Sequence, residues 1–148
     1  MQKAILSEMV KQNQFTSAFS LDRVTQENAS LRLNDRAASI GFIYRHIGET
    51  MNLFGQLLGT PTDVKNTTIG QVDQGETYEV DYSRELIARG YRMLEALVEG
   101  SSDEEWLEPV DTPFFGTVSR IRLFAHVLFH NSHHAGQISM TLAKGEAG

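Results

Sequence analysis

Four long segments of this chain repeat their apolar residues at the spacing of an α-helix, and turn-rich segments separate them. The last of the four, from about Val118 to Ala143, contains no proline. Amphipathic helices bury their apolar faces against one another, and a long connection can link the end of one helix to the start of the next at the opposite end of a bundle. The pattern therefore predicts an all-α fold, a four-helix bundle with long connections.

The other three helices are expected from about Gln2 into the twenties, from Asp35 to Leu58, and from Asp81 or Ser83 to Gly100. Asp81 or Ser83 could cap the third, because short polar side chains accept hydrogen bonds from the first backbone amides of a helix. The apolar positions expected to face the core are Ile5, Met9, Phe15 and Phe19 in the first helix, Phe42, Ile43, Ile47, Leu53, Phe54 and Leu57 in the second, and Leu86, Met93, Leu94 and Leu97 in the third.

Two of the connecting segments are long enough to have a role of their own. The polar segment from Thr62 to Glu79 is interpreted as a crossover between opposite ends of the bundle, and the alternative is a flap over a functional site. The segment from Ser101 to Gly116 carries three aromatic residues, which either close one end of the core or line a substrate pocket. These aromatic residues are Trp106, Phe114 and Phe115.

Four of the five histidines lie close together in the last expected helix, as His126, His130, His133 and His134. Residues four apart on a helix are separated by about 6 Å along its axis, so His130 and His134 can face a single ion. Both lie within or at the edge of the apolar face, whereas His126 and His133 are turned further from it. The fifth, His46, falls in the middle of the apolar face of the second helix. Two packed helices can therefore bring three imidazoles together.

Three histidines with one open position are typical of a catalytic metal site. We therefore predict that His46, His130 and His134 bind a divalent metal ion, with zinc and nickel expected first, although imidazoles also suit iron and copper. His126 could replace one of the pair, and the histidines could instead be structural residues of the core. Asn131 follows His130, so the helix lacks the glutamate base of an HExxH protease. Glu49, one turn beyond His46, could supply a carboxylate near the metal, but an exposed side chain is expected there.

Composition limits the remaining possibilities. A length of 148 residues predicts a single domain spanning residues 1–148, and 41% hydrophobic residues can form its core. A formal charge of −6 without a basic cluster argues against nucleic acid as a partner. The absence of long apolar runs and of a signal-like start predicts a cytoplasmic protein that does not span a membrane. Because the chain has no cysteine, any sulfur chemistry must come from a bound small thiol.

The sequence HVLFHNSHHAGQI, preceded by TVSRIRLFA and by a lone histidine on the second helix, resembles the DinB-like superfamily, which is related to the YfiT-type metal-dependent hydrolases. The resemblance implies the same three histidine ligands, a homodimer, and a role for Gly136 and Gln137 in tight packing of the last helix. Many members have glutamate where this chain has Asn131, and a basic residue in place of Ala135. An acidic contact to the metal ligands is therefore not expected from this helix.

The resemblance also implies that the chain could be a thiol S-transferase. Our leading hypothesis is a metal-dependent transferase that activates a low-molecular-weight thiol for attack on an electrophilic small molecule. The alternatives are a metal-dependent hydrolase and a non-enzymatic, stress-related helical binding protein. Small residues on the outer face of the last helix would allow another helix, internal or from a second subunit, to approach closely. They are Ala125, Ser132, Ala135, Gly136 and Ser139.

Overall fold

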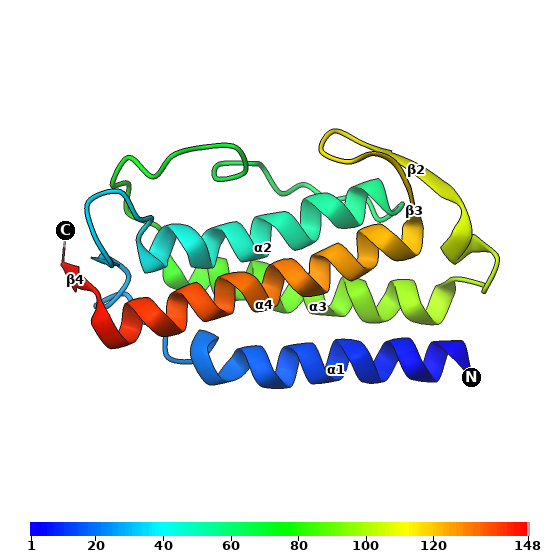
Figure 1. The fold of residues 1–148 in the computed structure, drawn as a ribbon, viewed down its shortest axis with the longest axis horizontal. Coiled ribbons are helices and arrows are strands. Elements are labelled where there is room, and N and C mark those ends of the chain that lie inside the picture. The colour runs from blue at the N-terminus through cyan, green and yellow to red at the C-terminus, as the bar shows by residue number, and fades with distance from the viewer. Residues whose placement is uncertain (148) are drawn as a thin grey trace.

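The computed structural model describes residues 1–147, and its fold is a four-helix bundle, which confirms the predicted class (Figure 1). Between the third and fourth helices lie a short 3-10 helix and an antiparallel hairpin, and a second strand pair joins the α1–α2 connection to the end of the chain. Helical periodicity did not predict these strands. The elements are α1 (Gln2–Leu21), β1 (Leu31–Arg32), α2 (Ile40–Leu57), α3 (Val80–Gly100), η1 (Glu105–Leu107), β2 (Pro109–Thr112), β3 (Gly116–Ser119), α4 (Arg120–Lys144) and β4 (Glu146–Ala147).

The order of the helices around the bundle differs from their order along the chain. Both α1 and α2 pack against α3 and α4, so α1 and α2 occupy opposite corners of the bundle. Figure 1 shows that α2 and α3 run in the same direction. The connection between them, residues 58–79, must therefore return along the whole length of α2, which confirms the predicted crossover. No helix among residues 1–147 is both long and apolar enough to span a membrane.

The parallel pair α2 and α3 packs closely because glycines lie at their contact. A Cβ atom added to Gly48 of α2 would lie 2.7 Å from the Cβ atom of Leu86, and one added to Gly90 of α3 would lie 2.7 Å from the Cβ atom of Met51. Any larger residue at either position would force the helices apart. The two glycines therefore fix how closely α2 approaches α3.

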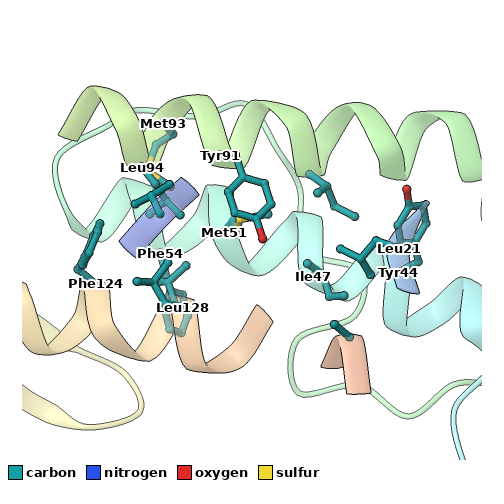
Figure 2. Close-up of a cluster of buried hydrophobic side chains, with 14 of the residues drawn as sticks. Leu21, Tyr44, Ile47, Met51, Phe54, Tyr91, Met93, Leu94, Phe124 and Leu128 are labelled. Carbon is teal, nitrogen blue, oxygen red and sulfur yellow. The ribbon is translucent and has the colours of Figure 1, made fainter. Parts of the chain in front are cut away.

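Large apolar side chains from α2, α3 and α4 point toward one another in the centre of the bundle (Figure 2). Trp106 of η1 closes one end of this core, since it is only 1% exposed and its ring centroid lies 5.0 Å from that of Phe124. The prediction that the aromatic segment closes the core is therefore confirmed for Trp106. Side chains labelled in Figure 2 include Tyr44, Ile47, Met51 and Phe54 of α2, Tyr91, Met93 and Leu94 of α3, and Phe124 and Leu128 of α4.

The predicted core face of α1 is wrong. Its expected core positions are 54%, 46%, 63% and 67% exposed at Ile5, Met9, Phe15 and Phe19. The helix carries apolar residues on both sides, so their spacing alone does not identify the buried one. A serine also occupies the true core face and weakens its pattern. The buried residues of α1 are Leu6, Val10, Ser17 and Leu21.

Two predicted helix starts are also corrected. The second helix begins at Ile40 rather than Asp35, because the Ser39 hydroxyl accepts a hydrogen bond from the backbone N–H of Phe42, 3.2 Å away. An N-cap of this kind ends the non-helical segment before it.

The third helix begins one residue before Asp81, and neither candidate acts as its cap. The N-cap residue is Glu79, whose side chain makes no capping hydrogen bond. The hydroxyl of Ser83 instead accepts a hydrogen bond of 2.8 Å from the side chain of Arg45 on α2. Ser83 is thus a contact between α2 and α3, and its polarity does not mark a helix start.

Candidate metal centre

Three histidine side chains converge between α2 and α4. The Nε2 atom of His130 lies 3.0 Å from that of His46 and 3.1 Å from that of His134. The three possible ligand atoms all lie within 4.8 Å of one another, and all three side chains are half-buried. The structure therefore brings together the three residues that helical spacing placed on facing sides.

A chain of hydrogen bonds fixes which nitrogen of His46 carries its proton. The Thr68 hydroxyl lies 2.6 Å from a carboxylate oxygen of Glu49 and 3.1 Å from Nδ1 of His46. A carboxylate only accepts, so the hydroxyl donates its single proton to Glu49 and accepts from Nδ1–H of His46. The Nε2 atom of His46 therefore presents a lone pair to the other two histidines.

The same reasoning applies to His134. Its Nδ1 atom lies 2.6 Å from the side-chain carbonyl oxygen of Gln137, which can only accept. Nε2 of His134 is consequently unprotonated and also faces the cluster. Gln137 orients a histidine and does not provide the helix packing that the resemblance implied. Gly136 does not serve close packing within this chain, since a Cβ atom there would meet nothing within 4 Å.

Glu49 is buried, which corrects the expectation that it is exposed. Its side chain is only 1% exposed and accepts four hydrogen bonds from Thr67 and Thr68, two from backbone amides and two from hydroxyls. Both threonines belong to the crossover connection, whose pairing with α2 leaves no periodic signal in the sequence. The crossover thus also supports the site, through the contact of Thr68 with His46.

The acidic contact comes from α2 and not from Asn131 of α4. Asn131 is fully buried and points into the core, where its amide nitrogen lies 3.2 Å from the sulfur of Met51 and 3.3 Å from the side-chain oxygen of Asn13. The carboxylate that contacts a histidine partner is that of Glu49, through Thr68. Asn131 of α4 thus stands where the resembling proteins often have glutamate, and the acidic group of this site is Glu49 of α2.

Burial keeps the three histidines neutral. Desolvation, with a smaller effect of His134, lowers the pKa of His46 to about 4. Desolvation and the neighbouring histidines lower the pKa of His130 further, and burial also lowers that of His134, against the opposing effect of Gln137. Metal ligation requires neutral imidazoles, so the site is ready for an ion at pH 7.

The spacing of the nitrogens fits a metal ion. Three nitrogens bound at about 2.0–2.1 Å to a tetrahedral zinc lie about 3.4 Å from one another. The Nε2 separations of 3.0 and 3.1 Å are close to this value. The Nε2 atoms of His46 and His134 carry lone pairs because their protons lie on Nδ1, and lone pairs so close to a third nitrogen repel unless a cation or proton lies between them. His46, His130 and His134 could therefore hold an ion.

The remaining two histidines stand outside this group. His126 is half-buried, and its ring centroid lies 5.9 Å from that of His130, while His133 is exposed. His126 instead contacts Phe115, whose ring centroid is 4.6 Å away. Phe114 and Phe115 are 53% and 44% exposed, so this part of the aromatic segment lies beside α4 and does not close the core.

The model of the DinB superfamily matches residues 12–138. This chain belongs to the DinB superfamily. The match includes all three converging histidines and confirms the family suggested by the histidine motif. No curated protein matches this DinB-superfamily chain at a significant level.

Solved structures share the fold of this DinB-superfamily member at low sequence identity. A conserved protein from Enterococcus faecalis is 14% identical with a TM-score of 0.72, over 95% of each chain. YfiT from Bacillus subtilis is 12% identical with a TM-score of 0.72, over 96% of this chain and 86% of its own. A DinB-like protein from Bacillus cereus is 22% identical with a TM-score of 0.64, over 92% and 89%. YfiT is described as having an unusual four-helix bundle topology.

Proposed function

We propose that this protein is a metal-dependent transferase in which His46, His130 and His134 bind one divalent ion, zinc or nickel. The convergence of three neutral imidazoles, two of them held by acceptors at Nδ1, is the observation that carries this proposal. Metal-binding histidines commonly donate their second N–H to such acceptors. Three protein ligands would leave a divalent ion one position for a small molecule.

The bound ion would lower the pKa of a thiol or water at its open position and so supply a nucleophile at neutral pH. A thiol suits this chain because Glu49, the nearest buried carboxylate, already accepts four hydrogen bonds. It is therefore not free to take a proton from water as a general base. Since the chain has no cysteine, the thiol is a low-molecular-weight cosubstrate.

The transfer consists of one substitution. The thiol loses its proton to solvent, its sulfur forms a bond to an electrophilic carbon, and the leaving group departs with the electron pair of the broken bond. His46, His130 and His134 position the nucleophile, and the hydrogen bonds from Thr68 and Gln137 hold two of their rings in place.

Hydrolysis is the second candidate. YfiT from Bacillus subtilis, which shares the fold, is described as a probable metal-dependent hydrolase. In a hydrolase, water would replace the thiol at the same three histidines. The two candidates differ in one measurable respect, because hydrolysis proceeds without added thiol.

Elemental analysis of the purified protein, followed by a thiol-dependence assay, tests this proposal. We expect about one metal ion per chain, lost in the His130→Ala, His134→Ala double variant and retained in His133→Ala, which removes an exposed histidine of the same helix. The metal-loaded protein should consume electrophiles from a broad panel only with thiol present. Turnover without thiol favours the hydrolase, and an absence of metal even after reconstitution leaves a non-enzymatic binding protein.

We also propose that the protein is a cytoplasmic homodimer that acts on a small molecule and not on nucleic acid. Ile5 and Met9 lie two turns and one turn before Asn13, which contacts α4, and Phe129 and Met140 are exposed on α4. We propose that these exposed apolar side chains form a dimer surface. A second copy would cover it, and the exposed Gly136 allows close approach there.

A further inference from the structure

The metal-site histidines belong to a longer row of polar side chains on α4. Arg122, His126, His130 and His134 are spaced four residues apart, so they follow one ridge of the helix. His130 and His134 belong to the converging group, whereas Arg122 and His126 lie closer to the start of α4. The β2–β3 hairpin faces this part of the ridge, since Phe115 contacts His126.

A cavity of about 180 Å³ that is open to solvent lies between the hairpin and the helix, lined by Phe115, Val118, Arg122 and His126. The rings of Phe115 and His126 meet at an angle of 67°, and Phe54 stacks on His126 at a centroid distance of 5.7 Å. Cavities of about 150 Å³ are known to hold benzene. Because Phe115 and His126 already touch each other, an aromatic ring would rest against these two rings and Val118 and would not lie between them.

The cavity also offers groups that suit an anion. Arg122 forms no ion pair with any residue in the described part of the chain, and it lies in the first turn of α4, where the helix dipole is positive. The ring nitrogens of His126 make no hydrogen bond to residues 1–147, so they are free to bind a ligand. Asp111, on the neighbouring strand β2, is hydrogen-bonded to Thr117. An aromatic ring and a carboxylate thus both have a place here.

We propose that this cavity binds a small aromatic carboxylic acid, with its ring resting against Phe115, Val118 and His126 and its carboxylate on Arg122. The ring centroid of His126 lies 5.9 Å from that of His130, so a molecule bound here lies next to the three histidines. The site would then select the electrophilic substrate. That last role rests on the proposed transferase function, whereas binding of the acid does not depend on it.

The test is an amide-shift NMR titration of the zinc-loaded, isotope-labelled protein with 3-phenylpropanoate, with acetate and 3-phenylpropanol as comparison ligands. The variants Arg122→Gln and Phe115→Ala remove the charge and the ring. Their controls are Arg92→Gln, an exposed arginine of α3, and Phe19→Ala, an exposed ring of α1 that does not line the cavity. Phe115→Leu serves as a second variant that keeps apolar bulk if the hairpin of Phe115→Ala is disturbed.

We expect 3-phenylpropanoate to shift the amides of Phe115, Arg122 and His126, with a Kd raised about tenfold by either cavity variant and unchanged by the controls. Acetate, which lacks the ring, and 3-phenylpropanol, which lacks the charge, should bind about tenfold more weakly. Equal binding by either comparison ligand, or an unchanged Kd in both cavity variants, overturns the proposal. Retained binding without thiol-dependent turnover overturns only the transferase function.

Discussion

Replacing Glu49 by alanine should destabilise the protein and weaken its metal site together. The carboxylate accepts hydrogen bonds of 2.9 and 3.0 Å from the backbone amides of Thr67 and Thr68, and their hydroxyls donate two more. A buried donor left without a partner costs about 1–3 kcal/mol. Because the two hydroxyls can turn toward other acceptors, the amides dominate, and we expect Glu49→Ala to lower the free energy of unfolding by about 3 kcal/mol.

Urea denaturation of the metal-free protein measures this loss, with Glu85→Ala as the control because Glu85 is an exposed glutamate of α3. The control should change the free energy of unfolding by less than about 0.5 kcal/mol. Thr68→Val then separates the two effects, since it removes the hydroxyl that holds His46 but leaves the backbone amides in place. Zinc affinity should fall about 10–100-fold in Thr68→Val. A stability of Glu49→Ala equal to that of the control, or unchanged zinc affinity in Thr68→Val, would refute this account.

Three further predictions follow from the packing and the charges. The metal-free protein should lose stability as the pH falls from about 6.5 toward 4, by about 1.4 kcal/mol per pH unit for each histidine. The reason is that the folded-state pKa of His46 and of His130 lies below the unfolded value, so the unfolded chain takes up protons first. Urea titrations across this range measure the slope, and a flat profile contradicts the prediction. Gly90→Ala should lower the free energy of unfolding, measured by urea denaturation, by about 1–3 kcal/mol, because the added Cβ atom would overlap that of Met51. An unchanged urea midpoint would mean that α2 and α3 can move apart without cost. Phe129→Arg should convert the proposed dimer to a monomer in sedimentation analysis, whereas a wild-type protein that is already monomeric rules the dimer out.

The amino-acid sequence alone predicted those features of the structure that follow from the helical spacing of apolar residues. The helices that contribute the histidines show clear apolar faces, so helical spacing alone places His46, His130 and His134 on facing sides. It was not sufficient for α1, whose two apolar sides are equally periodic and whose exposed side includes Phe15. The position of Phe15 depends on which neighbours α1 meets, and the helical period does not contain that information.

Glu49 shows a second limit of sequence reasoning. Its helical position borders the face of His46, where an exposed and a buried glutamate give the same pattern. Burial of the carboxylate became favourable only because Thr67 and Thr68 supply four donors from a distant, non-periodic segment. Contacts between a helix and a connection leave no spacing rule in a single sequence.

The helix arrangement explains why that connection meets the metal site at all. Because α2 and α3 are parallel, the chain must travel back along α2 to begin α3 (Figure 1). On this return Thr67 and Thr68 meet Glu49, and Thr68 also meets His46. An antiparallel pair joined by a short turn would leave Glu49 without donors and His46 without Thr68. The topology therefore determines more than packing, since it also supplies the partner that fixes the proton on Nδ1 of His46. A shortened connection that removed Thr67 and Thr68 should consequently impair zinc binding even if the four helices remained folded.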